Sequence, residues 1–247
     1  MSYSERTYRT QFSAERFKSF TVNWQETDLW IGVDYQSFNN SMPQFALSVI
    51  QKLRQKMDSY LKLFPLFHAS LAPIEPQETM PHFARAMAEA SAKAGVGPMA
   101  AVAGYFASHL SEKLLSNFKI EELVIENGGD YYIKIRKKLA IAVFAGESTF
   151  SGKTGFSLEP GSYGVCTSAG KVGPSLSFGT TDATVVIADC PVIADAWATS
   201  LGNRVNSELE LTKTIKLAET VPEISSCIII FENNIGFCGE TIPFSLN

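Results

Sequence analysis

The sequence predicts an α+β fold of antiparallel sheets with packed helices. Strand-like alternation and helical periodicity occur in separate blocks along the chain, not in strict alternation. Hydrophobic residues make up 45% and charged residues 19% of the 247 residues, which favours a sizeable core over disorder. No repeat, low-complexity tract or linker divides the chain, so we expect one domain spanning residues 1–247.

The chain is expected to open with a β-hairpin. Residues 20–24 and 30–35 alternate between apolar and polar side chains, and residues 26–28 could turn between them. A one-sided helix is predicted next, with Ser41 as its cap and Pro43 in its first turn.

Two further helices are predicted, from Pro81 to Gly95 and from Pro98 onward. The helix after Pro98 has a surface of very small residues, among them Ala103 and Gly104. Tight packing against another backbone is one interpretation, and close approach of a flat ligand is the other.

The second half is expected to be mostly β-structure. The remaining predicted elements are strands at 123–125, 131–135, 139–145, 163–167, 184–188 and 226–231, a helix at 191–203, a turn at Asn233-Asn234 and a short last strand.

The charge balance argues against two classes of partner. The net charge of −4 and the pI near 5.5 disfavour broad binding to nucleic acid or to an anionic membrane.

The first residues lack the apolar region of a secretory signal, and no stretch reaches the roughly 18 apolar residues of a membrane span. We therefore expect a cytoplasmic protein in which four cysteines stay reduced: Cys166, Cys190, Cys227 and Cys238.

The segment Asn127-Gly128-Gly129-Asp130 lies between two predicted strands. Asn-Gly is the usual signal of a type I′ hairpin turn, and this is the simpler interpretation. The functional alternative is that the two glycines expose backbone N–H groups to a phosphate or a ring edge.

Asp195 and Thr199 are four residues apart on the predicted helix 191–203, so both side chains project from one face. A carboxylate and a hydroxyl are ligands that suit Mg²⁺. The alternative is a solvated Asp and a Thr that bonds back to its own helix.

A polar loop follows the predicted strand at 163–167. Thr167, Ser168, Gly170 and Lys171 could hold a phosphate, although the segment does not match a Walker A loop. Cys166 is a weak candidate nucleophile because no histidine is near it in the sequence.

Taken in order, these motifs resemble those of the ApbE-like proteins, a FAD:protein FMN transferase-like family, and most closely its short cytosolic branch. The resemblance covers nearly the whole chain. It is carried by Glu26-Thr27-Asp28-Leu29 and by the segments at 96–104, 126–130, 164–168 and 194–199.

The resemblance implies a fold of tandem T-fold-like halves and a Mg²⁺-dependent flavin chemistry. Typical members bind FAD, cleave its pyrophosphate and attach FMN to a Ser or Thr hydroxyl of an acceptor protein; some hydrolyse FAD instead. The implied cofactor-binding residues are Asn127, Gly128, Gly129, Asp130, Thr167, Ser168 and Gly170, and the implied metal ligands are Asp195, Thr199 and the carbonyl of Ala103.

Two departures from the family pattern keep other functions open. Pro174 stands where typical members carry a histidine, and the segment Val102–Tyr105 lacks their lysine. The alternatives are a flavin- or nucleotide-binding module without catalysis and an enzyme for an unrelated small substrate. No catalytic residue can be named from the sequence, and a homodimer stays open because nothing sets an interface.

Overall fold

The computed structural model describes residues 15–170 and 179–246. Its strands are β1 (Phe17–Trp24), β2 (Thr27–Asp34), β3 (Leu123–Asn127), β4 (Asp130–Ile135), β5 (Leu139–Val143), β6 (Thr154–Leu158), β7 (Gly161–Ser168), β8 (Ala183–Ala188), β9 (Ser226–Phe231), β10 (Asn234–Gly239) and β11 (Phe244–Ser245). Its helices are α1 (Met42–Leu63), α2 (Pro65–Ala69), α3 (His82–Ala94), the 3₁₀ helix η2 (Pro98–Ala101), α4 (Val102–Asn117), α5 (Pro191–Gly202) and α6 (Glu208–Glu219).

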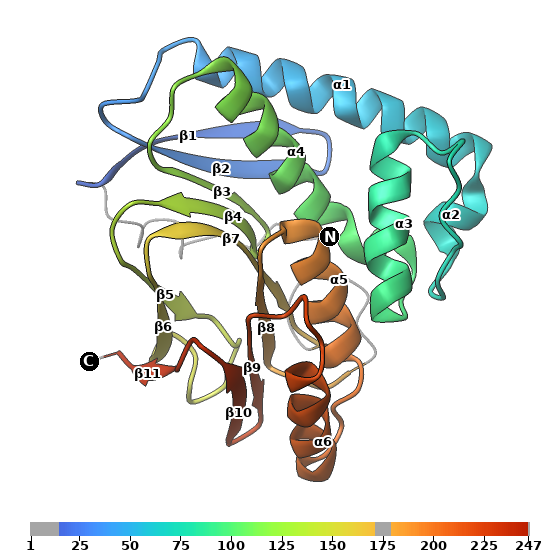
Figure 1. The fold of residues 1–247 in the computed structure, drawn as a ribbon, viewed down its shortest axis with the longest axis vertical. Coiled ribbons are helices and arrows are strands. Elements are labelled where there is room, and N and C mark those ends of the chain that lie inside the picture. Colours follow the sequence, from blue (N-terminus) through green and yellow to red (C-terminus); the bar gives the residue numbers. More distant parts are fainter. Residues whose placement is uncertain (1–14, 171–178, 247) are drawn as a thin grey trace.

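An eight-stranded sheet forms the middle layer, in the order β1-β2-β3-β4-β7-β8-β9-β10 (Figure 1). Every neighbouring pair in it is antiparallel. A small sheet, in the order β11-β6-β5, makes a separate layer. The predicted α+β class with antiparallel sheets is therefore confirmed.

The two faces of the eight-stranded sheet bury two different cores. On β2, Ile31 points into a core shared with the helices, whereas the adjacent Trp30 points into a core shared with β5 and β6. This alternation follows the period of two of a strand, and it explains why nearly all of β2 is buried. The sheet is thus covered by helices on one face and by the small sheet on the other.

The predicted helices form, with two differences in how they begin. Ser41 occupies the N-cap position of α1, but its side chain makes no capping bond, and its hydroxyl donates to Oδ1 of Asn39 at 2.7 Å. Helix α3 ends as predicted at Gly95, whose φ of 74° is the left-handed conformation that glycine favours. At Pro98 the chain first makes η2 and only then continues as α4.

The turns predicted at 26–28 and at Asn233-Asn234 are each shifted along the chain. The first hairpin turns at Gln25-Glu26, so Thr27 and Asp28 belong to β2, and the last hairpin turns at Glu232-Asn233. Gln25 and Glu232 each take a φ of 53°, the left-handed conformation that such tight turns require. The short helix α2, helix α6 and strand β6 were not expected. Among the described residues, no helix is both long enough and apolar enough to cross a membrane.

Candidate functional site

The segment Asn127-Gly128-Gly129-Asp130 is a two-residue hairpin between β3 and β4. Asn127 pairs with Asp130 in the sheet, and the glycines have φ values of 70° and 102°, which satisfy a type I′ turn. The Gly129 N–H donates to Oε1 of Glu126 at 2.9 Å, and the Thr167 N–H donates to the Gly129 carbonyl at 3.2 Å. The hairpin is therefore held against the end of β7.

The first turn of α4 reaches the same place from the other side. The Nδ2 of Asn127 donates to the carbonyl of Ala103 at 3.1 Å, and the Gly104 N–H donates to Oδ2 of Asp195 at 2.8 Å. Asp195 lies on α5, so its carboxylate satisfies an amide that the first turn of a helix leaves without an internal partner. Two helices and the hairpin thus meet at Asp195.

A buried pair of carboxyl groups lies at this meeting point. Asp130 and Asp195 are 7% and 9% exposed. Burial, followed by the charge of Asp195, raises the pKa of Asp130 well above its usual value. Burial raises the pKa of Asp195 to about 7, against the lowering effect of hydrogen bonds from the Gly104 and Ala103 amides. Two like charges in a dry site favour either a bound proton or a cation.

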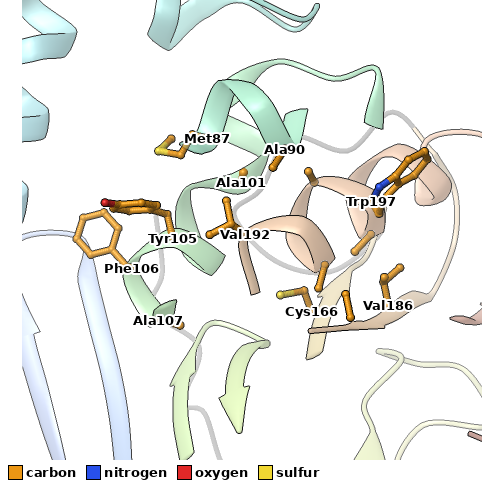
Figure 2. Packing of buried hydrophobic residues seen from close by; sticks show 14 of the residues in the cluster. Met87, Ala90, Ala101, Tyr105, Phe106, Ala107, Cys166, Val186, Val192 and Trp197 are labelled. Atoms are coloured by element: carbon orange, nitrogen blue, oxygen red, sulfur yellow. The ribbon is translucent and has the colours of Figure 1, made fainter. Parts of the chain in front are cut away.

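Cys166, which the sequence indicates is only a weak candidate nucleophile, lies beside this pair. It is opposite Asp130 in the pairing of β4 with β7, and its Sγ donates to the Pro191 carbonyl at 3.3 Å. Burial raises the pKa of the Cys166 thiol, and the charges of Asp130 and Asp195 raise it further. Figure 2 shows Cys166 within the buried cluster beneath α5. The thiol therefore stays protonated, which is a poor state for a nucleophile.

The small surface of α4 is used for packing at Gly104. A methyl group there would lie 2.3 Å from the Pro191 carbonyl oxygen and 2.9 Å from the Cβ of Asp195. Gly164 on β7 approaches the same turn, since its added methyl would lie 2.3 Å from the Pro191 nitrogen. The two glycines allow α4 and β7 to pack closely against the start of α5. At Gly104 the small surface therefore serves packing, and no room is left for the ring of a flat ligand.

The structure does not connect every predicted site residue to this cluster. Ser168 pairs with Thr184 of β8, and the Gly170 N–H donates to the Thr181 carbonyl at 2.9 Å. Thr199 is half-buried one helical turn after Asp195. Within residues 15–170 and 179–246, no hydrogen bond joins Ser168, Gly170 or Thr199 to the carboxyl pair. The predictions on Lys171 and Pro174 lie outside the described residues.

The residues that the resemblance implies as metal ligands offer oxygen donors, which suit Mg²⁺. A carboxylate, the hydroxyl of Thr199 and the carbonyl of Ala103 are hard ligands, and Mg²⁺ needs only one or two protein carboxylates. The described residues contain no group of three His, Cys, Asp or Glu side chains of metal-binding type. Their buried residues include no Lys or Arg that could neutralise Asp130 and Asp195. The donor set thus fits a hard divalent cation and not a soft one.

The fold is shared with proteins of known structure. The chain resembles the apo crystal structure of the flavinyl transferase ApbE of Pseudomonas stutzeri, with a TM-score of 0.60, 13% identity, and coverage of 93% of this chain and 94% of the other. The ApbE protein of Thermotoga maritima gives a TM-score of 0.56 at 15% identity, with coverage of 90% and 96%. At these identities the likeness establishes the fold.

The sequence comparisons establish the family. A family model described as AbpE bacteria matches residues 9–223. A UPF0280 protein of Methanococcus maripaludis is 34% identical over 91% of this chain and 92% of its own length. Another, from Methanocaldococcus jannaschii, is 34% identical over 87% and 88%. The chain therefore belongs to the ApbE-like family, as its motifs predicted.

Sequence reasoning missed two contributors to the site. The Gly104 amide and the buried Glu126 carboxylate both hold site residues in place, although each lies inside a segment already matched to the family. The adjacency of Glu126 to the Gly-Gly turn was the available signal, because an acidic side chain there can accept the exposed turn amides.

Proposed function

We propose that this protein binds FAD and cleaves its pyrophosphate in a Mg²⁺-dependent reaction that transfers FMN to a Ser or Thr hydroxyl of an acceptor protein. One observation carries the proposal. Asp130 and Asp195 are buried together, and no buried Lys or Arg lies among the described residues to compensate them. A bound proton or a divalent cation would compensate this pair, and pyrophosphate chemistry calls for the cation.

Asp195, Thr199 and the Ala103 carbonyl would hold the metal. Bound Mg²⁺ supplies charge neutralisation to the pyrophosphate oxygens. Asn127 positions the Ala103 carbonyl through its hydrogen bond, and the Gly104 amide orients the Asp195 carboxylate. Gly128 is exposed at the hairpin tip, where the absence of a side chain lets a flat ring approach the backbone.

The transfer breaks one bond and forms another. The acceptor hydroxyl oxygen attacks the FMN phosphorus, the pyrophosphate P–O bond breaks, and AMP leaves with the bridging oxygen. The hydroxyl proton goes to solvent or to AMP. If water attacks instead, the products are FMN and AMP, which is the hydrolytic form of the same reaction. The structural neighbour from Pseudomonas stutzeri is a flavinyl transferase, which supports this choice of substrate.

A non-catalytic flavin-binding module is the second candidate. Asp195 already accepts amide hydrogen bonds at the start of α4, so its carboxylate has a structural use without any metal. The segment Val102–Tyr105 at that helix start lacks the lysine of typical members, and Pro174 replaces their histidine. Both lost groups are of the kind that handles phosphate charge or a proton.

The test is incubation of the purified protein with FAD, with and without Mg²⁺, followed by chromatography for FMN and AMP. We expect Mg²⁺-dependent formation of both products, which falls at least about 100-fold in Asp195→Ala and strongly in Thr199→Val. Asp189→Ala is the matched control, because this exposed aspartate lies just before α5 and outside the carboxyl pair.

Because Asp195→Ala also removes a partner of α4, circular dichroism must show that each variant is folded at the assay temperature. Thr199→Val keeps the proposal testable if Asp195→Ala does not fold. Saturable FAD binding without products from the wild-type protein would support the binding module and contradict catalysis. If the wild-type protein neither binds FAD nor forms products, the family's fold carries a different ligand here.

A further inference from the structure

A concave surface lies on the helical layer, and Asp130 and Asp195 are not among the residues that line it. It is a groove of about 1180 Å³ between α1 and α4, and the start of α3 closes one end. The two helices pack against each other in the layer above the sheet (Figure 1). Tyr105 lines the groove from the first turn of α4, whereas the Gly104 amide in the same turn meets Asp195. Figure 2 shows the Tyr105 ring extending away from Val192 of α5.

Aromatic rings line this groove. The Tyr105 and His109 rings are stacked, with centroids 5.8 Å apart and an interplanar angle of 17°. The Tyr60 ring meets Phe83 edge to face at 5.4 Å. Flat aromatic walls of this kind bind planar apolar groups, and the volume is sufficient for a small organic molecule.

The rim of the groove is positively charged although the whole chain carries −4. Lys52 and Lys56 lie one turn apart on α1, and Lys113 faces them from α4. Glu112 is the acidic residue among the groove's lining. The three ammonium groups are exposed and converge on one opening, which attracts an anion to this place on an otherwise acidic protein.

His109 supplies an unused hydrogen-bonding group in the wall. Its Nδ1 is buried and has no hydrogen-bond partner among the described residues. Burial, and then the charges of Lys113, His82 and Lys56, lower the pKa of His109 to about 4, so the ring is neutral at pH 7. A buried nitrogen without a partner is costly, and such groups commonly mark a site that a ligand or water completes.

We propose that this groove is a binding site for a small organic anion that contains an aromatic ring. The ring packs against Tyr105 and Tyr60, and its carboxylate or phosphate pairs with Lys52, Lys56 and Lys113. The site is independent of the proposed FAD chemistry, because none of its residues belongs to the cluster around Asp195.

The histidines provide a direct readout, because the chain contains only His68, His82 and His109. His82 and His109 line the groove, and His68 on α2 does not. The full-length protein, labelled with ¹⁵N-histidine, is titrated with phenyl phosphate and with benzoate at fixed ionic strength, and NMR follows the ring nitrogens. We expect saturable shifts of His82 and His109 while His68 stays unchanged.

Two comparisons separate the contributions of ring and charge. Inorganic phosphate and benzyl alcohol, tested alone, should each bind at least about tenfold more weakly than phenyl phosphate. The double variant Lys56→Gln/Lys113→Gln should weaken phenyl phosphate about tenfold. The matched control is Lys213→Gln/Lys216→Gln, two exposed lysines of α6, which should change nothing.

The proposal is overturned if neither aromatic anion saturates, or if His68 shifts as much as the groove histidines. If both double variants weaken phenyl phosphate binding equally, the net charge of the protein explains the change, and the proposal is also overturned. If inorganic phosphate binds as tightly as phenyl phosphate, the ligand's ring contributes nothing to binding, and the proposed aromatic recognition is wrong. FAD turnover should be the same in all these variants, so failure here and failure of the proposed function are distinguishable.

Discussion

Asp195 holds the start of α4 and, in the proposed function, the metal. Its folded-state pKa of about 7 exceeds the value of 3.8 expected in the unfolded chain. Between these values the folded state binds more protons than the unfolded state, so the free energy of unfolding falls as the pH rises. Above pH 7 the metal-free protein therefore carries the full penalty of a buried charge.

Asp195→Asn should remove this penalty, because the amide is neutral and its oxygen can still accept from Gly104. We expect urea denaturation at pH 8 without metal to show a gain of roughly 2 to 4 kcal/mol, which disappears below about pH 4. Asp189→Asn, at an exposed position, should change nothing. A variant that is less stable than the wild type at pH 8 would show that the negative charge at residue 195 is stabilising and would refute this prediction.

The sequence placed Asp195 and Thr199 on one helix and Gly128-Gly129 in a turn, and it did not predict where these elements meet. The spacing of Asp195 and Thr199 and the Gly128-Gly129 turn are local signals that follow from helix and hairpin geometry. The Gly104 amide is 91 residues away from the carboxylate that it meets. Such convergence depends on strand register and on how two helices pack, which no local pattern encodes.

At the scale of elements, the contact of α4 with α5 sets the geometry of the site. Gly104→Ala should force α4 away from the Pro191 carbonyl, which an added methyl would approach to 2.3 Å. We expect a loss of about 3 kcal/mol in the free energy of unfolding and a parallel loss of metal-dependent activity. Denaturant titration and the FMN assay measure the two effects.

Gly202→Ala is the matched control, because Gly202 is also helical and the nearest atom to its added methyl is Oγ1 of Thr184 at 3.3 Å. That contact needs only a small adjustment, and alanine favours the helix. We expect this change to be nearly neutral. If Gly104→Ala were equally neutral, the close approach of α4 to α5 would not be required.

The elements that were predicted are those with a strong local period. Helices α1 and α3 each bury one apolar stripe, and β9 is an apolar run after its first residue. Helix α6 was missed because it buries few large apolar side chains and exposes Leu209. Its start nevertheless carries the Ser-x-x-Glu signal of a capping box, since the Ser207 hydroxyl accepts from the Glu210 amide at 3.3 Å.

At the scale of the whole molecule, the eight-stranded sheet joins two cores that share its strands. We therefore predict one cooperative unit over residues 1–247. Phe156→Ala in β6 empties a fully buried position of the core beneath the sheet, and Leu110→Ala in α4 does the same in the helical core. Each should cost about 3 to 4 kcal/mol.

Both variants should shift the same single transition, measured by far-ultraviolet circular dichroism and by tryptophan fluorescence. Leu209→Ala, at a position 65% exposed, is the control and should leave the midpoint unchanged. Two separate transitions, with Phe156→Ala lowering only one, would mean that the small sheet unfolds on its own.

The fold class could be predicted at this scale because blocks of strands and blocks of helices leave few layered arrangements. The order of the strands could not, since β7 pairs with β4 across the inserted β5 and β6. That pairing places Cys166 opposite Asp130 and brings the site together.

A crystal structure of the protein grown with FAD and Mn²⁺, with the metal located by anomalous scattering, tests the proposed metal site directly. We expect a metal peak about 2.1 Å from a carboxylate oxygen of Asp195 and the flavin ring beside the Gly128-Gly129 turn. Metal bound elsewhere, or flavin bound only in the groove between α1 and α4, would contradict this expectation.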